Sequence, residues 1–222
     1  MRAFANSEAL AEALADAVSR ALLARISRDG QAALAVSGGT TPLRFFDVLS
    51  AKDLNWSAIT ITLVDDRWVP ETSPRSNAGL VRRHLLKSHA ASARFLPLVT
   101  DAPAPEEGCV LVNNMVAAMP LPFAAVVLGM GTDGHTASFF PGGDRLMQAL
   151  EPGPGILVES LRAEAAVEPR ITLTLPVLLA ADYVALHIEG ETKRRVLENL
   201  TIAMPVSAVL ARQPAPDIFW SP

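Results

Sequence analysis

The feature that most constrains this chain is a series of short apolar runs separated by helical patterns. The four clearest runs span residues 32–36, 59–64, 123–128 and 183–188. Their nearly continuous hydrophobicity is typical of strands buried on both faces, as in a parallel sheet. Helices are expected over residues 7–28, 41–49, 77–86, 109–118 and 192–200. The alternation predicts an α/β fold with a doubly wound, mostly parallel sheet and helices on both faces.

The remaining sequence adds two short strand candidates and no second domain. Residues 171–175 and 217–220 are the further strands, and the Pro-rich patches at 101–105 and 152–154 are expected to be surface loops. Half of the 222 residues are apolar and 19% are charged, which is enough for a sizeable core. With no internal repeat, low-complexity tract or convincing linker, we expect one domain over residues 1–222.

The charge balance limits the classes of partner. A net charge of -4 and a pI near 5.6 argue against general affinity for nucleic acid or for an anionic membrane. A small anionic ligand remains possible, because a few well-placed cations can hold one phosphate. Cys109 is the only cysteine, so neither an internal disulfide nor a CxxC zinc motif can form.

Neither end of the chain nor its interior predicts a targeting or membrane segment. The first 27 residues carry Glu8, Glu12 and Asp16 and have no uninterrupted apolar core. The most apolar stretch, residues 121–130, is far shorter than the roughly 18 residues that a membrane span needs. The sequence therefore predicts a cytoplasmic protein.

A first glycine-containing loop follows the apolar run at residues 32–36. It reads Ser37-Gly38-Gly39-Thr40, and Thr41 and Pro42 are expected to be the N-cap and the first residue of a helix. Glycines let the backbone approach a ligand closely, and a helix N-terminus favours an anion. The loop is a candidate phosphate site, and an ordinary tight strand–helix turn is the alternative.

A second glycine-rich loop, residues 129–138, follows the apolar run at 123–128 and contains His135. Ligands of open α/β sheets bind outside the carboxyl ends of the strands, so this histidine is placed for chemistry. A loop histidine that caps a turn is the alternative. His84 and His89 lie in or beside a basic stretch and are expected to be solvated, whereas His187 is expected in the core or on a sheet face.

Three basic residues stand at strand ends or in loops. Arg67 follows the second apolar run, Arg170 precedes residues 171–175, and Lys193 opens the helix after Gly190. Each alone would usually be a surface charge, but three that converge at one sheet edge would suit a phosphate.

The sequence resembles the 6-phosphogluconolactonase family, which belongs to a wider group that includes glucosamine-6-phosphate deaminases. The matching pieces are SGGTTP at 37–42, DDRWVP at 65–70, SNAGLVRRHLL at 76–86, GMGTDGHTASFFP at 129–141, PRITLTLPVLLAA at 169–181 and GETK at 190–193. They follow the family's order and span most of the chain from residue 32 onward. The segment at 129–141 is the most distinctive of them.

The resemblance implies roles for individual residues. Backbone groups of Ser37, Gly38, Gly39 and Thr40 would hold the substrate phosphate. Arg67 matches the family arginine, Arg170 and Lys193 match the basic positions of the later motifs, and His135 matches the general base. The family usually reads Asp-Glu-Arg where this chain has Asp65-Asp66-Arg67, and the roles of Asp65 and Asp66 stay open.

The resemblance implies hydrolysis of 6-phospho-D-glucono-1,5-lactone to 6-phospho-D-gluconate, an early step of the pentose phosphate pathway. Ester hydrolysis needs an activated water and a stabilised oxyanion, and a neutral imidazole can accept a proton near neutral pH. Asp133 is placed to orient His135, and either Arg67 or loop N–H groups could face the oxyanion. We expect no metal and no cofactor, because one clustered His gives no zinc ligand set. The expected partner is the small lactone, bound by a monomer or small homo-oligomer, with no nucleic acid or membrane.

Two other functions remain as alternatives. A glucosamine-6-phosphate deaminase-isomerase has a loop of the form DGHIAFNEP, with a Glu seven residues after the Asp, where this chain has Phe140. The absent carboxylate favours the lactonase. A non-catalytic sugar-phosphate sensor usually carries a DNA-binding module, whereas only about one helix precedes the first apolar run here. A sensor would bind the sugar phosphate without turning it over.

Overall fold

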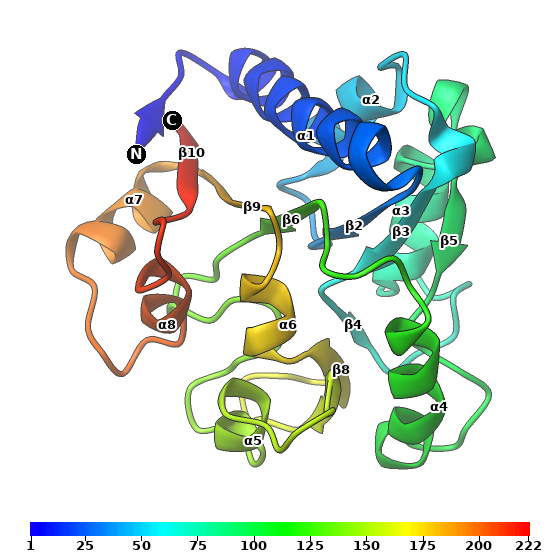
Figure 1. The fold of residues 1–222 in the computed structure, drawn as a ribbon. Coiled ribbons are helices and arrows are strands. Elements are labelled where there is room, and N and C mark those ends of the chain that lie inside the picture. The colour runs from blue at the N-terminus through cyan, green and yellow to red at the C-terminus, as the bar shows by residue number, and fades with distance from the viewer.

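The centre of the fold is a sheet of seven parallel strands in the order β1-β10-β9-β6-β2-β3-β5 (Figure 1). The computed structural model describes residues 1–222. The strands are β1 (Arg2–Ala3), β2 (Ala32–Val36), β3 (Ile59–Leu63), β5 (Arg94–Leu96), β6 (Ala125–Leu128), β9 (Tyr183–Glu189) and β10 (Asp217–Ser221). Every residue of β2 and β6 is buried, so the apolar runs are strands covered on both faces, as predicted.

Helices and strands largely alternate along the chain. They are α1 (Ser7–Asp29), α2 (Leu43–Ser50), α3 (Asn77–His84), α4 (Pro105–Ala117), α5 (Leu146–Leu150), α6 (Leu175–Leu179), α7 (Glu191–Glu198) and α8 (Val206–Leu210). Two local signals bound α1. The Asn6 side chain accepts from the Ala9 N–H at 2.9 Å, and Gly30 ends the helix in the left-handed region at φ 76°.

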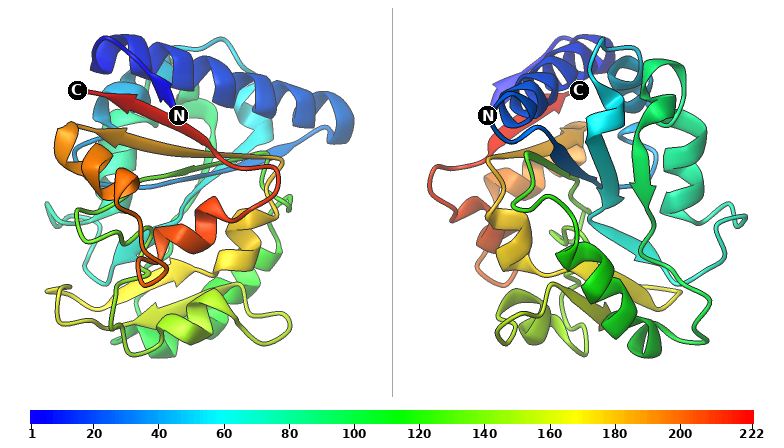
Figure 2. Two further views of the ribbon diagram at one scale, coloured as in Figure 1. Left: turned by 90° about the vertical axis from the view of Figure 1, so that its left-hand side faces the viewer. Right: turned by 45° about the vertical axis from the view of Figure 1, so that its right-hand side comes forward.

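Helices and a second, smaller sheet cover the two faces of the main sheet. Figure 2 shows α1 across one face, while α4, α5, α6 and the small sheet lie on the opposite side. One contiguous core of 53 buried residues joins these layers. The predicted α/β architecture with helices on both faces is confirmed.

The small sheet is a feature that the sequence pattern did not predict. It consists of β4 (Asp65–Arg67), β8 (Arg170–Leu173) and β7 (Val158–Leu161), and both of its strand pairs are antiparallel. The strand expected at residues 171–175 thus starts at Arg170, ends at Leu173, and belongs to this sheet. Helix α6 begins at Leu175, since Pro176 suits the first turn of a helix.

The start of α2 also differs from the prediction. Pro42 itself is the N-cap residue, and no side chain caps this helix. The Thr41 hydroxyl instead accepts from Lys193 Nζ at 3.2 Å, so the prediction of Thr41 as N-cap was wrong. A cation more distant in the sequence replaces the helix N–H as its partner.

The strand order places a switch point between β2 and β6. From β2 the chain proceeds to β3 and β5 on one side, then returns to β6 on the other side of β2. The loops that follow β2 and β6 therefore leave the same sheet edge next to each other, which is where ligands of open α/β sheets bind.

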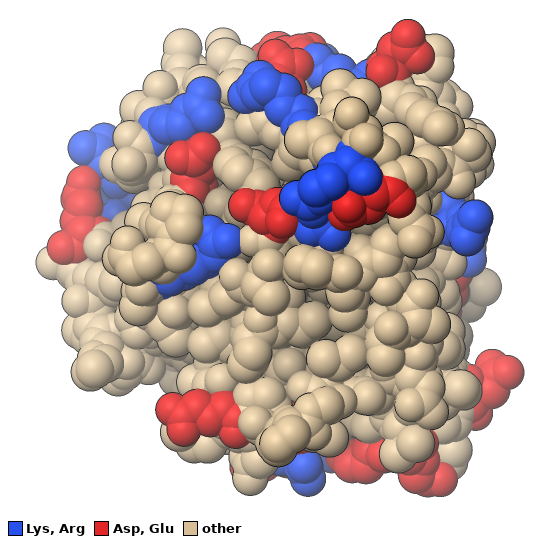
Figure 3. Space-filling model, in the orientation of Figure 1, with Lys and Arg blue, Asp and Glu red and all other residues tan.

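The outer surface carries charges of both signs. On the face drawn in Figure 3, basic and acidic side chains lie among each other, with broad uncharged areas between them. Arg44 with Glu8 and Lys52 with Asp16 are among the ion pairs of the structure. No helix of the fold combines the length and the apolar character that crossing a membrane requires.

Asp66 closes the N-terminus of α3. Its carboxylate accepts from the backbone N–H groups of Asn77 and Ala78 and from that of Arg67, at 2.8 to 3.0 Å. The Ser76 hydroxyl accepts from the Gly79 N–H at 3.1 Å. The first three N–H groups of α3 are thus satisfied, and the same carboxylate holds the backbone of Arg67. Burial raises the pKa of Asp66 to about 6, against the effect of these backbone hydrogen bonds.

We predict that Asp66→Ala destabilises the fold by about 2 kcal/mol at pH 7.5, because three backbone N–H groups, two of them buried, lose their acceptor. Urea unfolding followed by circular dichroism measures this change. Asp53→Ala is the matched control, since Asp53 is exposed. Equal stability of the two variants would contradict the capping role.

Candidate functional site

One cavity at the switch point brings the predicted site residues together. It has a volume of about 350 Å³. Eight of the nine predicted residues line it, namely Ser37, Gly38, Gly39, Thr40, Arg67, His135, Arg170 and Lys193. The ninth, Asp133, contacts the side chain of His135.

The first loop is tied to the second at its base. The Ser37 hydroxyl accepts from the Gly129 N–H at 2.9 Å, and the Ser37 N–H donates to the Val127 carbonyl. Gly39 has a φ of 89°, and no atom lies within 4 Å of the position that a side chain would take. A Cβ at Gly38 would lie 2.0 Å from Asn77 Oδ1. Only glycine fits at position 38, and at position 39 the backbone is open to the cavity.

The second loop folds around His135. The Gly131 N–H donates to the His135 carbonyl at 2.9 Å, and the Thr136 hydroxyl donates to the Gly129 carbonyl at 2.7 Å. His135 Nδ1 lies 2.6 Å from Asp133 Oδ1, which also accepts from the His135 backbone N–H. Burial alone would raise the pKa of Asp133, but these hydrogen bonds and the nearby imidazole outweigh it and lower the pKa.

The ionised Asp133 decides which nitrogen of His135 carries the proton. A carboxylate only accepts hydrogen bonds, so Nδ1 is the protonated nitrogen of the neutral ring, and Nε2 has the free lone pair. The ring also stacks on Phe140 with 4.3 Å between the centroids. Two contacts therefore hold the imidazole in place while Nε2 stays available as a base.

Two arginines face each other across the small sheet. Arg67 of β4 and Arg170 of β8 are directly opposite in the antiparallel register, an arrangement that like charges destabilise. Arg67 Nη1 donates to the Arg75 carbonyl at 2.6 Å, and the Arg170 guanidinium lies over Phe140. The Nε atoms of both arginines are buried without a hydrogen-bond partner. An anion in the cavity would relieve both the repulsion and the unpaired donors.

Asp65 provides an acidic group in the same wall. Its carboxylate accepts from the Ser138 hydroxyl at 2.5 Å and lies 3.8 Å from Arg170 Nη1. Its carbonyl accepts from Asn77 Nδ2 at 3.0 Å. Asp65 therefore links the small sheet, α3 and the second loop at one side of the cavity.

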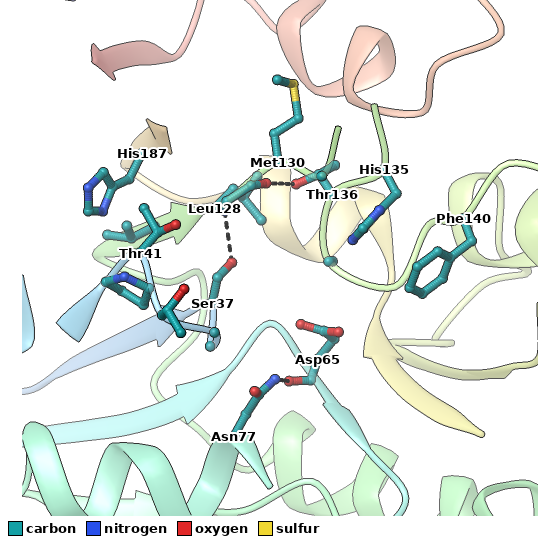
Figure 4. A pocket seen from close by; sticks show the side chains of 18 of the residues that line it. Ser37, Thr41, Asp65, Asn77, Leu128, Met130, His135, Thr136, Phe140 and His187 are labelled. Atoms are coloured by element: carbon teal, nitrogen blue, oxygen red, sulfur yellow. Dashed lines mark hydrogen bonds between the residues drawn. The ribbon is translucent and has the colours of Figure 1, made fainter. Parts of the chain in front are cut away.

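Lys193 enters from α7 near the first loop. Its ammonium group contacts the Thr41 hydroxyl. Partial burial lowers the pKa of Lys193, and the charge of Glu189 acts in the opposite direction. Figure 4 shows Ser37, Thr41 and His187 on one side of the cavity and His135 with Phe140 on the other. The cavity thus has one end built by the first loop and another built around His135.

Sequence reasoning missed several lining residues, among them Asn77, Phe140 and His187. Asn77 and Phe140 lie inside the motifs quoted above, so motif membership was the available signal. His187 was expected in the core or on a sheet face, and it is 2% exposed on β9. The missing signal was its position near the carboxyl end of a strand beside β6.

A cation-rich cavity with an oriented imidazole, at the switch point of a parallel sheet, is typical of enzymes that act on small anionic ligands. Residues 5–220 match the family described as glucosamine-6-phosphate isomerases/6-phosphogluconolactonase, and the chain belongs to this family.

Individual relatives carry the more specific of these names. The chain is 49% identical to a 6-phosphogluconolactonase of Rhizobium meliloti (strain 1021), over 100% of this chain and 98% of that protein. It is 46% identical to a 6-phosphogluconolactonase of Mesorhizobium japonicum, over 99% and 94%. The crystal structure of a 6-phosphogluconolactonase from Shewanella baltica OS155 superposes with a TM-score of 0.96 at 39% identity, over 100% of this chain and 97% of that one.

Gly131 offers a test of the His135 geometry. A Cβ there would lie 2.3 Å from the ring atoms Nδ1 and Cε1 of His135 and 2.6 Å from Asp133 Oδ1. We predict that Gly131→Ala separates the ring from Asp133, as seen by a crystal structure of the variant. Gly129→Ala is the control, since its nearest neighbour would be Ser37 Cβ at 3.8 Å. An unchanged Asp133–His135 contact in Gly131→Ala would refute this reading of the loop.

Proposed function

We propose that this chain hydrolyses 6-phospho-D-glucono-1,5-lactone to 6-phospho-D-gluconate, as the names of its relatives suggest. The observation that carries the proposal is the oriented His135, whose Nε2 is free in the same cavity as two arginines with unpaired donors. Lactone hydrolysis needs this combination of a base and local positive charge.

The proposed reaction begins with a water molecule at the lactone carbonyl. His135 Nε2 takes a proton from the water as its oxygen bonds to C1, and Asp133 stabilises the imidazolium that forms. The carbonyl oxygen becomes negative, and Arg67 faces it. When the C1–O5 bond breaks, the imidazolium returns its proton to the ring oxygen. The new carboxylic acid then ionises, so each turnover releases one proton.

Substrate binding in this proposal depends on the other end of the cavity. Backbone groups of residues 37–40 and the ammonium group of Lys193 hold the phosphate, and Arg170, whose guanidinium lies over Phe140, adds positive charge from across the cavity. Both arginines face a ligand that carries two negative sites in the transition state, the phosphate and the oxyanion.

Phe140 favours the lactonase over a deaminase-isomerase. It occupies the position at which the deaminase loop carries a carboxylate, and its ring stacks on His135. No carboxylate therefore stands at that position to exchange protons with an amino sugar.

The proposal also includes the remaining predictions from the sequence. The chain works as one domain in the cytoplasm, as a monomer or small homo-oligomer, on a small lactone and without nucleic acid or membrane. Asp133 and His135 contact each other, and the proposed steps use only protein groups and water, without a metal or cofactor. The proposed function is tested by measuring proton release after fresh 6-phosphogluconolactone is added, with a correction for spontaneous hydrolysis. Release no faster than the spontaneous rate would refute the function.

For the base, we predict that His135→Ala lowers kcat about 10²–10⁴-fold with the fold intact, the usual contribution of a general base. Proton release measures kcat, and circular dichroism checks the fold. His89→Ala is the control, because His89 is exposed. A folded His135→Ala enzyme with more than half of its activity would exclude His135 as the base.

For the phosphate, we predict that Lys193→Ala and Arg170→Ala raise KM for the phosphorylated lactone at least tenfold, since each removes a charged hydrogen bond. Both should change kcat/KM for unphosphorylated glucono-1,5-lactone much less. Arg67→Ala is the contrasting variant and should impair both substrates. Equal losses on the two substrates for Lys193→Ala and Arg170→Ala would remove them from the phosphate site.

A further inference from the structure

The cavity contains a second histidine, His187. A carboxylate contacts its Nε2, whereas in His135 a carboxylate contacts Nδ1. His187 lies on β9 and lines the cavity near Thr41 and Lys193. Its Nε2 is 3.0 Å from Glu189 Oε1, and the Ser7 hydroxyl donates to Glu189 Oε2 at 2.6 Å. Its Nδ1 is buried without a hydrogen-bond partner. One side of the ring is therefore fixed, while the other has no protein group to bind.

The partner of Nε2 determines which nitrogen of the His187 ring carries the proton. The hydrogen bonds from His187 and Ser7 lower the pKa of Glu189, so its side chain is a carboxylate that can only accept. Nε2 therefore carries a proton in either state of the ring. In the neutral ring Nδ1 is a bare lone pair, and in the imidazolium it is a buried N–H donor.

The surroundings of His187 favour a negative ligand. From α7, Lys193 directs its ammonium group to the same end of the cavity, and the N-terminus of α2 begins there. Phe45 of α2 packs edge-on against the imidazole, with 6.3 Å between the ring centroids, and offers no hydrogen bond. Figure 4 shows His187 beside Thr41, across the cavity from His135.

We propose that His187 binds the substrate phosphate as an imidazolium, with Nδ1–H donating to a phosphate oxygen and Nε2–H held by Glu189. Glu189 and Ser7 act as positioning residues for the ring. The substrate assignment rests on the proposed function, but the anion site itself does not. Donation through Nδ1 requires a proton on that nitrogen in the complex.

The charges near His187 define the pH dependence. Glu189 on its own strand and Lys193 on α7 face it, while α1 contributes the Ser7 hydroxyl, α2 the Phe45 ring, and β10 the paired residue Phe219. Because only the charged ring donates through Nδ1, the affinity for the phosphate should fall wherever rising pH removes that proton. Lys193 would lose its own proton at higher pH, which requires a measurement specific to the histidine.

Nitrogen-15 NMR of histidine-labelled enzyme makes that distinction. We expect the His187 Nδ1 signal to lie in the range of an N–H when 6-phosphogluconate or inorganic phosphate is bound at pH 7.5. The chain has four histidines, and single variants assign their signals. A His187 Nδ1 that stays unprotonated at saturation would overturn the proposal.

Two substitutions separate the ring nitrogens by kinetics. The amide nitrogen of His187→Asn can occupy the place of Nδ1 and donate without a proton, whereas His187→Gln reaches toward Glu189 and loses the Nδ1 donor. We expect His187→Gln to raise KM for the phosphorylated lactone at least tenfold, with little change for glucono-1,5-lactone. His187→Asn should retain most of the affinity and lose its pH dependence. His84→Gln, outside the cavity, is the control.

The outcomes distinguish this inference from the proposed function. Unchanged KM in a folded, active His187→Gln enzyme would overturn the role of His187 and leave the lactonase standing. Protonation of His187 by inorganic phosphate, in an enzyme that does not hydrolyse the lactone, would support the anion site and refute the lactonase. If both variants fail to fold, the NMR measurement on the unmodified enzyme still decides.

Discussion

The site depends on the switch point of the sheet between β2 and β6. Because neighbouring parallel strands carry successive loops to one edge, residues 37–41 and 129–138 meet there although they lie far apart in the sequence. The hydrogen bond between Ser37 and the Gly129 N–H joins the two loops at their base. The proposed phosphate loop and the loop that carries His135 are thereby held by the fully buried strands β2 and β6, which preorganises the distance between them.

Two histidines at this edge are prepared for different tasks by their carboxylate partners. Asp133 holds Nδ1 of His135 and leaves Nε2 as a lone pair, which suits a base. Glu189 holds Nε2 of His187 and leaves Nδ1 without a protein partner, which would suit an anion once the ring is charged. The same side chain can thus accept a proton from water at one end and bind phosphate at the other. In each case the carboxylate contacts the ring nitrogen opposite the one that we propose acts on the ligand.

Much of this arrangement could be predicted from the sequence, because it follows from local pattern. The apolar runs predicted β2 and β6, and the glycine-rich loops after them predicted where His135 would lie. The features that were missed depend on distant partners. Lys193 donates to the Thr41 hydroxyl, which was expected to cap α2. Ser7, near the other end of the chain, donates to Glu189. The short strand β8 was not assigned to a second sheet, because four apolar and polar residues in alternation do not distinguish parallel from antiparallel pairing.

The central claim is that the cavity has a phosphate end and a reacting end. A crystal structure with bound 6-phosphogluconate tests it most directly. The account predicts the phosphate within hydrogen-bond distance of residues 37–40, Lys193 Nζ and His187 Nδ1, with the C1 carboxylate facing His135 Nε2. Binding in the reverse direction, with the phosphate at His135 and the carboxylate on the first loop, would contradict the account.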